Sequence, residues 1–391
     1  MINKRYLSQY IIDDLSNKMV FIGGPRQVGK TTLVQHLGQS VYPDYQYLNW
    51  DRQSQRQAIR AERFEASAKL LIFDELHKYR QWKNYVKGIY DTQKEQYHIL
   101  VTGSARLDLY KKGGDSLMGR YHYYRLHPFS VAELLQHQVL PEPFTELQFV
   151  HYPTAPALFT DLLKFSGFPE PFFAKQPRTL RRWQNTRLDR LIKEDVRDIE
   201  SIRDLSALQV LAELLPQRVG SQLSLNALRE DLGVAHKTVA LWMEVLERFY
   251  YHYRIYPFMQ RGFAALKKEP KLYLWDWTPV TEPGARFENI IASHLLKFVH
   301  GLHDILGHKA VLWYIRDISG REVDFLVTVN NQPWFAVEAK LSDRTPSKPL
   351  RYFQDKLHIP YVYQVVAETG IDERVKNIRV LSADLFCTAL L

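Results

Sequence analysis

Short apolar runs alternate with helical stretches through residues 1–130. The runs at 19–22, 70–73 and 99–101 each end in glycine or polar residues. Buried strands whose carboxyl ends carry such residues are typical of a parallel sheet with its site at that edge. The pattern therefore predicts an α/β domain over residues 1–130.

Helical spacing dominates residues 131–215, which we expect to form a connector or lid. Two short helices are then expected within 224–248, with Ser224 as an N-cap and Gly233 at the turn between them. Aromatic, strand-like segments follow at 250–256 and 271–277. A helix–turn–helix followed by a hairpin predicts a winged helix over residues 216–282.

The second helix of this predicted winged helix carries some residues that favour DNA binding and some that oppose it. It offers Lys237 and Thr238, but Glu244 and Glu247 would repel phosphate. A structural winged helix that packs between domains is therefore favoured over one that reads DNA.

Composition narrows the class of protein. The 391 residues allow two or three domains, and 46% apolar with 24% charged residues excludes disordered and fibrous chains. No apolar run approaches the ~20 residues of a membrane span, and none resembles a secretory signal. The single cysteine, Cys387, excludes a disulfide scaffold and fits a reducing cytoplasm, so we expect a cytoplasmic protein without membrane contact.

The chain also carries a basic surplus. Fifty-two Lys and Arg against 43 Asp and Glu give a net charge of +9, which favours contact with nucleic acid. One run from Lys175 to Lys193 holds a single acid, Asp189. It is either a surface for a polyanion or a solvated helix face paired with Glu194, Asp195, Asp198 and Glu200.

The first apolar run leads into a phosphate-binding motif. Gly24 to Thr31 satisfies G-x-x-x-x-G-K-[ST] between a strand and a helical stretch. We expect the backbone to wrap the β-phosphate of ATP, Lys30 to neutralise β/γ charge, and Thr31 to ligate Mg²⁺. The full set expected around the nucleotide in this segment is Gly24, Pro25, Arg26, Gln27, Val28, Gly29, Lys30, Thr31 and Thr32.

Two further strand ends are predicted to complete this site. Asp74 follows an apolar strand and is expected at the Mg²⁺, and Glu75 directly after it is placed to polarise the attacking water. Thr102 and Ser104 end the third strand, where either could hydrogen-bond the γ-phosphate or the water. Arg120 is the candidate arginine finger, with Arg26, Arg106 and Arg125 as alternatives.

These motifs carry a family resemblance that covers nearly the whole chain. Residues 24–33, 74–77, 102–104 and 117–120 resemble the prokaryotic AAA-type ATPases. They resemble in particular the family whose C-terminal half is a domain of unknown function with a restriction-endonuclease-like core, a match that Gly167-Phe168-Pro169-Glu170 and the winged-helix stretch support. That family usually has two adjacent arginines in the phosphate loop. This chain has Arg26-Gln27, which puts any role of the second arginine in doubt.

A hairpin near the C-terminus segregates its charged residues on one face. If residues 322–328 and 334–340 form a hairpin centred on Asn331, each residue pairs with the one equally far on the other side of Asn331, so the two residue numbers sum to 662. One face is then apolar, and the other sets Asp324 opposite Glu338 and Glu322 opposite Lys340. Facing carboxylates destabilise a sheet unless a cation lies between them, and a divalent metal is the simplest such cation.

Asp followed by Glu-x-Lys on adjacent strands resembles the core of the PD-(D/E)xK nucleases. The resemblance implies that Asp324 and Glu338 hold Mg²⁺, or Mn²⁺, that Glu288 on the preceding helix is a further ligand, and that Lys340 helps orient or deprotonate water. The alternatives are a solvated sheet face and a nuclease-like fold retained for binding. The resemblance makes residues 283–391 a restriction-endonuclease-like domain.

Two functions follow from these sites. In the first, ATP binding and hydrolysis gate or power metal-dependent DNA cleavage. In the second, ATP drives a molecular switch whose nuclease-like domain only binds nucleic acid or a protein partner. Both functions are compatible with a homo-oligomer, because an arginine finger that acts on a neighbouring subunit requires assembly.

Overall fold

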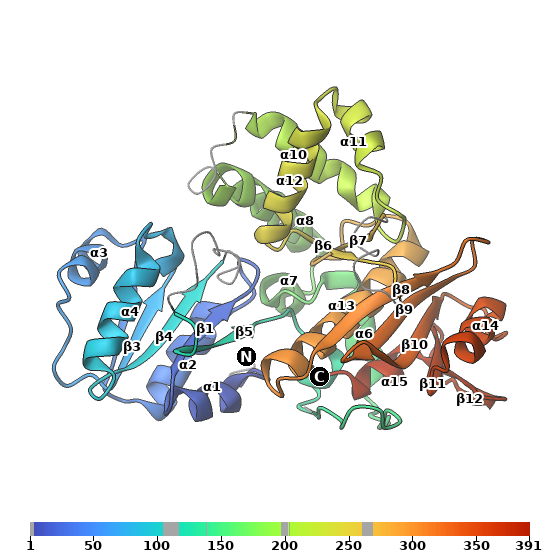
Figure 1. The fold of residues 1–391 in the computed structure, drawn as a ribbon, viewed down its shortest axis with the longest axis horizontal. Helices are drawn as coiled ribbons and strands as arrows, with labels where there is room; N and C mark the ends of the chain where they lie inside the picture. Colours follow the sequence, from blue (N-terminus) through green and yellow to red (C-terminus); the bar gives the residue numbers. More distant parts are fainter. Residues whose placement is uncertain (1–3, 105–116, 138, 197–201, 203, 260–268) are drawn as a thin grey trace. The chain divides into compact units, whose positions relative to one another are not determined.

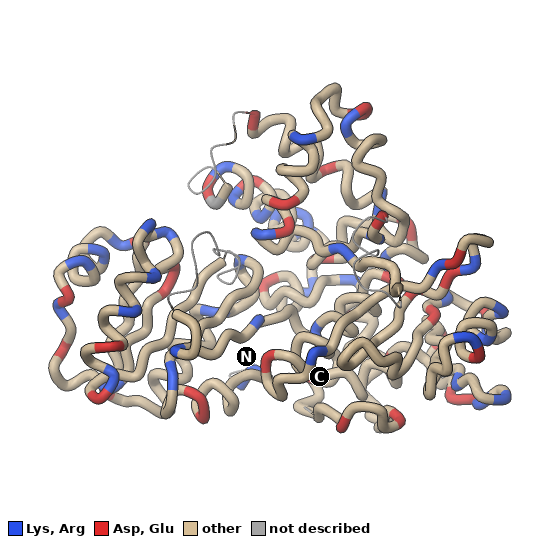
Figure 2. Tube along the Cα trace, in the orientation of Figure 1, with Lys and Arg blue, Asp and Glu red and all other residues tan. Residues whose placement is uncertain are grey.

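The computed structural model describes residues 4–104, 117–137, 139–196, 202, 204–259 and 269–391. The chain divides into two compact units (Figure 1). Unit 1 holds residues 1–127, 190–203 and 248–250, and unit 2 holds 128–189, 204–247 and 251–391. Lys, Arg, Asp and Glu positions are interspersed along the trace of both (Figure 2). Among the described residues, no helix is long and apolar enough to cross a membrane.

Unit 1 is built on a five-stranded sheet in the order β2-β3-β4-β1-β5, with every neighbouring pair parallel. The strands are β1 (Met19–Gly23), β2 (Tyr45–Asn49), β3 (Leu70–Asp74), β4 (His98–Gly103) and β5 (Tyr121–Arg125). All residues of β1 and β3 are buried, as expected for strands covered on both faces. With a phosphate loop between β1 and the next helix, this is the P-loop NTPase fold.

Helices cover both faces of this sheet (Figure 1). The helical elements of unit 1 are α1 (Ser8–Leu15), α2 (Lys30–Val41), α3 (Gln53–Arg60), η1 (Leu76–Lys78), α4 (Trp82–Gln93) and the π-helical turn Leu191–Val196. An aromatic core forms where Phe21 of β1 stacks on Tyr121 at 4.4 Å and meets Trp82 at 5.6 Å. The predicted strands at 19–22, 70–73 and 99–101 are confirmed, whereas β2 and β5 were not anticipated.

The first part of unit 2 is helical, as predicted. Its elements are α5 (Val131–Leu134), α6 (Ala155–Phe165), α7 (Pro169–Ala174), α8 (Pro177–Arg190), α10 (Leu205–Leu214), η4 (Leu215–Arg218), α11 (Leu225–Leu232) and α12 (His236–Arg248). Ser224 caps α11 by accepting from the Ala227 N–H, and Gly233 ends it at φ 65°. The strands β6 (His252–Ile255) and β7 (Lys271–Leu274) pair antiparallel. These elements have the order expected of a winged helix, which stays a prediction.

A six-stranded mixed sheet forms the rest of unit 2, in the order β12-β13-β11-β10-β9-β8. Its strands are β8 (Ala310–Arg316), β9 (Glu322–Val329), β10 (Gln332–Lys340), β11 (Tyr361–Val366), β12 (Asp372–Val375) and β13 (Ile378–Ser382). The accompanying helices are α13 (Pro283–Asp304), α14 (Lys348–Leu357), α15 (Ala383–Phe386) and η6 (Cys387–Ala389). The chain as a whole is therefore α/β.

The predicted hairpin has the predicted register over its central part. Phe335 pairs with Val327, Ala336 with Leu326, and Val337 with Phe325, so each pair sums to 662. The register shifts by one between Pro333 and Phe335. The turn places Asn330 and Asn331 at φ 51° and 64°, a conformation that asparagine tolerates well.

A buried ion pair ties α13 to α5 inside unit 2. The Lys297 ammonium, 2% exposed, lies 2.5 Å from the Glu133 carboxylate and 2.9 Å from Ser130 Oγ. Ser130 Oγ in turn donates to the Leu391 carbonyl at 2.6 Å. Both charges are satisfied within the core, which is the condition under which a buried pair is tolerated.

Candidate functional site

The loop between β1 and α2 has the backbone of a phosphate cradle. Gly24 and Gly29 lie at φ 152° and 101°, values that residues with a side chain rarely adopt. A Cβ on Gly24 would lie 2.5 Å from the Leu126 carbonyl oxygen, so no larger residue fits there. The loop ends at the N-terminus of α2, whose free N–H groups and dipole favour an anion.

Lys30 and Thr31 begin α2 at the mouth of this cradle. The Lys30 ammonium is 5% exposed and donates to the Gly24 and Pro25 carbonyl oxygens, each at 2.9 Å. Thr31 Oγ1 donates to Asp74 Oδ2 at 2.8 Å, across from the end of β3. The structure therefore brings together the lysine, the hydroxyl and the first carboxylate of the predicted site.

Asp74 is held by hydroxyl groups from three neighbouring elements. Besides Thr31, Asp74 Oδ1 accepts from Thr102 on β4, and Oδ2 accepts from the Tyr47 hydroxyl on β2 at 2.5 Å. Thr102 therefore orients the Asp74 carboxylate, whereas its expected partner was the γ-phosphate or the attacking water. Burial and Asp74 raise the pKa of Tyr47, so its hydroxyl stays a donor. Tyr47 was missed because nothing in the sequence marked β2 as a neighbour of β3.

Glu75 lies one residue beyond β3 in a left-handed conformation, with φ 56°. Ser104 Oγ, at the end of β4, donates to Glu75 Oε2 at 3.1 Å. Burial raises the pKa of Glu75, which makes it a stronger proton acceptor once ionised. Burial also lowers the pKa of His77 to about 3, so its contact with Glu75 at 3.6 Å involves a neutral imidazole.

The other predicted loop residues lie around the cradle. Arg26 pairs with Glu194 of the π-helical turn at 2.9 Å. Gln27 lies at φ 64°, and its Oε1 has no hydrogen-bond partner among the described residues. Val28 is buried and its carbonyl accepts from Arg5 at 2.8 Å, while Thr32 is exposed on α2.

The structure does not bring Arg120 to this site. Arg120 precedes β5 and forms an ion pair with Asp91 of α4 at 2.7 Å. Its carbonyl accepts from the Met19 N–H at the start of β1, whereas Gly24 follows the end of that strand. Five strand residues span roughly 16 Å, so Arg120 lies at the opposite edge of the sheet. Arg125 pairs with Gly23 at the nucleotide edge, and Arg106 lies outside the described residues.

Two tyrosines close the base of the phosphate loop. The Tyr123 hydroxyl on β5 and the Tyr250 hydroxyl, from the segment after α12, lie 2.9 Å apart. Both lie against Gly23, the residue before the loop: a Cβ there would be 2.0 Å from Tyr123 Oη and 2.8 Å from Tyr250 Oη. The position of the loop therefore depends on a residue 227 positions away in the sequence.

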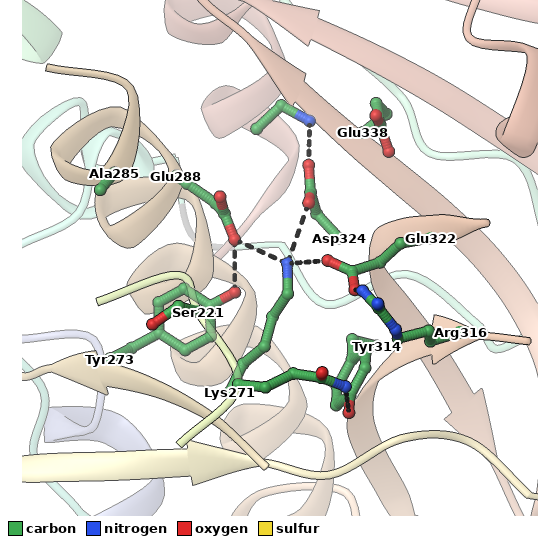
Figure 3. A network of polar contacts seen from close by, with 12 residues as sticks. Ser221, Lys271, Tyr273, Ala285, Glu288, Tyr314, Arg316, Glu322, Asp324 and Glu338 are labelled. Carbon is green, nitrogen blue, oxygen red and sulfur yellow. Dashed lines mark hydrogen bonds and ion pairs between the residues drawn. The ribbon is translucent and has the colours of Figure 1, made fainter. Parts of the chain in front are cut away.

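A second cluster of charged residues lies in unit 2, around Lys271 (Figure 3). The ammonium of this β7 residue contacts Glu322 at 2.7 Å, Glu288 at 3.1 Å and Asp324 at 3.2 Å. The Tyr273 hydroxyl donates to Glu288 at 2.6 Å. Burial alone would lower the pKa of Lys271, but the three carboxylates raise it above its ordinary value, so the side chain is charged.

Glu338 and Lys340 form a pair beside this cluster. Lys340 Nζ lies 2.7 Å from Glu338 Oε1, while Glu338 Oε2 is buried without a hydrogen-bond partner among the described residues. Burial, and then Asp324, raise the pKa of Glu338 to about 7. Asp324 Oδ2 accepts from the Ala339 N–H at 3.0 Å, which fixes its orientation.

The residues expected to hold a metal in unit 2 do not fit one in this arrangement. Glu288 and Asp324 do come together, but an ammonium lies between them where a metal was expected. Nowhere in the described part of the chain do three His, Cys, Asp or Glu side chains form a group able to hold a metal ion. Lys271 lies between Asp324 and the carboxylates of Glu288 and Glu322, whereas the cation beside Glu338 is Lys340.

The side chains of the basic run at 175–193 differ in their surroundings, and both alternatives for the run stay predictions. Arg178, Arg181 and Arg182 are exposed on α8. Lys175 instead pairs with Asp161 at 2.6 Å, and Arg187 stacks on the Phe168 ring at 4.5 Å. Of the acids expected to balance this run, Asp198, Glu200 and the side chain of Asp195 lie outside the described residues.

Three sequence families match successive parts of the chain. Residues 16–135 match a family described as an AAA domain. Residues 157–280 and 283–386 match two domains of unknown function, DUF8612 and DUF4143. Residues 16–135, with the sheet order and phosphate loop of unit 1, are therefore similar to an AAA-type P-loop ATPase domain.

Two uncharacterized proteins are similar to most of this chain. An uncharacterized protein of Methanocaldococcus jannaschii is 22% identical over 370 residues, covering 87% of this chain and 79% of that protein. One of Haemophilus influenzae is 23% identical over 357 residues, covering 83% and 82%. Each similarity extends over more than four-fifths of this chain.

Two solved structures resemble parts of the chain. The Aeropyrum pernix Orc1 protein in complex with DNA is 12% identical, with a TM-score of 0.33 over 74% of this chain and 92% of that one. The Thermotoga maritima RuvB Holliday junction branch migration motor is 18% identical, with a TM-score of 0.32 over 67% and 93%.

Proposed function

We propose that this protein binds and hydrolyses ATP at the carboxyl edge of the unit 1 sheet. The observation that carries the proposal is the Thr31–Asp74 hydrogen bond, 2.8 Å, directly beside the cradle that ends at Lys30. A hydroxyl and a carboxylate at this place are the oxygen ligands that Mg²⁺ uses in P-loop NTPases. Glu75, the proposed catalytic carboxylate, directly follows Asp74 at the end of β3.

Each side chain has a distinct role in this proposal. The loop N–H groups and Lys30 bind the phosphates and offset their negative charge. Thr31 and Asp74 hold Mg²⁺, which when bound neutralises charge that develops on the phosphate oxygens. Glu75 accepts a proton from the attacking water, and Ser104 holds the Glu75 carboxylate in position. A site with such a base is suited to hydrolysis rather than to phosphate transfer onto another substrate.

A binding and turnover assay tests this proposal. Wild type should bind a fluorescent ATP analogue with Mg²⁺ and release phosphate, and Lys30→Ala should lose both. A matched control is Lys83→Ala, which removes a lysine of α4 whose ammonium lies over the Trp82 ring, 5.8 Å from the ring centroid. Full phosphate release by Lys30→Ala would exclude the loop as the site.

For unit 2, we propose a role in binding a nucleic acid or protein partner under the control of the nucleotide, without cleavage. The observation that favours binding over cleavage is the Lys271 ammonium among the carboxylates expected to hold a catalytic metal. The competing proposal is a restriction-endonuclease-like site that cuts DNA with Mg²⁺ or Mn²⁺ through Asp324, Glu338 and Lys340. The exposed arginines of α8 are the surface we assign to a polyanion.

Supercoiled plasmid and a labelled duplex separate these two proposals. Binding without cleavage predicts intact plasmid at all Mg²⁺ and Mn²⁺ concentrations, and a change in duplex affinity or oligomer size when ATP is added. Nicking that disappears in Lys340→Ala would establish the nuclease instead. An Arg181→Ala/Arg182→Ala variant should weaken duplex binding if α8 is the contact surface; unchanged binding assigns the contact elsewhere.

A further inference from the structure

The carboxylate cluster of unit 2 is arranged around one buried ammonium. Lys271 Nζ contacts one oxygen each of Glu288, Glu322 and Asp324, and its side chain is 2% exposed. In Figure 3 these carboxylates, from α13 and β9, point inward to the lysine from β7. An ammonium with three oxygens at hydrogen-bond distance has all of its donors used.

The oxygens that do not face Lys271 are largely engaged as well. Asp324 Oδ2 accepts from the Ala339 N–H at 3.0 Å, and Glu322 Oε2 pairs with Arg316 at 2.7 Å. Glu338 Oε1 pairs with Lys340 at 2.7 Å. A metal ion needs several free oxygens at about 2.0–2.6 Å, so a metal here would have to compete with these contacts.

The charges of the cluster are almost balanced without a metal. Four carboxylates, Glu288, Glu322, Asp324 and Glu338, face three cations, Lys271, Arg316 and Lys340. A divalent ion added beside the ammonium would repel it at close range in a poorly solvated site. Metal and Lys271 therefore exclude one another from this position.

Lys271 is anchored by the backbone as well as by its charge. Its strand pairs with β6, where Ile255 faces Lys271, and Gln222 bridges to it from the other side. The ammonium also lies over the Tyr314 ring, 5.8 Å from the centroid. The backbone of Lys271 is therefore paired on both sides.

We propose that Lys271 is the resident counter-ion of this cluster, in the place a divalent metal would otherwise take, and that the natural chain binds no metal there. The carboxylates are then a latent metal site that opens only when the ammonium is removed. Glu288 lies on α13, Glu322 and Asp324 lie on β9, and Lys271 lies on β7, so the cluster holds the β6–β7 hairpin to the six-stranded sheet. This inference does not depend on ATP hydrolysis.

The test measures metal response in the full chain without nucleotide. Thermal unfolding and Mn²⁺ titration calorimetry are compared for wild type, Lys271→Met, Asp324→Asn and the double variant. Wild type and Asp324→Asn should respond alike to Mn²⁺. Lys271→Met should unfold at a lower temperature than wild type, because the carboxylates have lost their counter-ion. Added Mn²⁺ should raise the unfolding temperature of this variant by several degrees, because the ion binds between the carboxylates of the folded protein. The double variant should lose that gain.

Lys297→Met is the matched control. It also removes a buried lysine of unit 2, but one that faces a single carboxylate, Glu133. It should be destabilised without any gain from Mn²⁺, which separates metal capture from a general effect of losing a buried charge. An equal gain in Lys297→Met would overturn the proposal.

Two further results would also overturn it. One is a stoichiometric Mn²⁺ site in wild type that Asp324→Asn loses, and the other is a folded Lys271→Met that ignores Mn²⁺. If Lys271→Met cannot be recovered folded, the comparison of wild type with Asp324→Asn decides alone. Because no arm contains ATP, failure here leaves the proposed ATPase untouched, and loss of ATP turnover leaves this proposal untouched.

Discussion

Replacing Gly23 by alanine should disturb the phosphate loop through a steric clash beneath it. The added Cβ would lie 2.0 Å from Tyr123 Oη, 2.8 Å from Tyr123 Cζ and 2.8 Å from Tyr250 Oη. All three separations are far below ordinary van der Waals contact. The tyrosine hydroxyls form a hydrogen bond with each other at 2.9 Å, so both rings must shift, or β1 must, and the loop begins at the next residue.

The size of the effect follows from the contacts. Overpacking of a well-filled site costs about 1–3 kcal/mol in the free energy of unfolding. Tyr123→Phe alone removes one hydrogen bond, about 0.5–1.5 kcal/mol, and it also removes the atom closest to the new Cβ. The Gly23→Ala/Tyr123→Phe double variant should therefore be destabilised by less than the sum of the singles, by at least about 1 kcal/mol.

Urea unfolding of the four proteins measures this coupling, and binding of an ATP analogue reports on the loop itself. Gly23→Ala should weaken nucleotide binding, and the double variant should recover part of it. Gly88→Ala is the control, since Gly88 lies exposed in α4 with no atom within 4 Å of the new Cβ. Additive free energies, with unchanged nucleotide affinity in Gly23→Ala, would refute the reasoning.

Two other predictions concern single side chains. Ser104→Ala removes the 3.1 Å hydrogen bond to Glu75, so phosphate release should slow by up to about tenfold at unchanged ATP affinity. A loss of affinity instead would place Ser104 at the phosphates. His294 is buried, which lowers its pKa to about 4 in the folded protein. In the unfolded chain its pKa is ordinary, so the unfolded chain binds the proton more readily between the two pKa values. The folded protein therefore has its full stability above the ordinary pKa and loses stability as the pH falls toward 4. The free-energy difference between wild type and His294→Gln should shrink by about 2–3 kcal/mol from pH 7.5 to 4.5 in urea unfolding; a constant difference would contradict this.

The parts of the fold that the sequence predicts are those governed by local pattern. Alternation of period two places Val323 and Phe325 on the face opposite Asp324, which is enough to set the hairpin register, since a slip by one would bury the charges. The one-residue shift near Pro333 was not predictable, because it depends on how the turn is accommodated. The motif at 24–31 likewise needs only the strand before it and the helix after it.

The residues that were missed act across long separations in the chain. Lys271 lies 53 positions before Asp324, and the apolar neighbours Leu272 and Leu274 mark it only as part of a buried strand. The available signal was a lysine in a strand whose other residues are all apolar or aromatic. A charge buried there must have a partner, and the acids of the next domain were the candidates.

Strand order accounts for the position of Arg120. Its closeness in sequence to the other nucleotide residues suggested a place in the site, but β5 runs parallel to β1, so its first residues lie at the edge away from the loop. Only the order β4-β1-β5, which pairs strands 19–23 and 121–125, shows this. Tyr47 depends on the same kind of information, because β2 reaches Asp74 only as the neighbour of β3.

The most direct test of the proposed ATPase is the rate of phosphate release under saturating ATP and Mg²⁺ by wild type and Glu75→Gln, with nucleotide affinity measured on the same samples. Glu75→Gln keeps the size of the side chain and removes its ability to accept a proton. We expect ATP affinity to stay within a few-fold of wild type and turnover to fall by about 10²–10⁴-fold. Wild-type turnover by Glu75→Gln, or no turnover by the wild type, would contradict the assignment of this site as an ATP-hydrolysing centre.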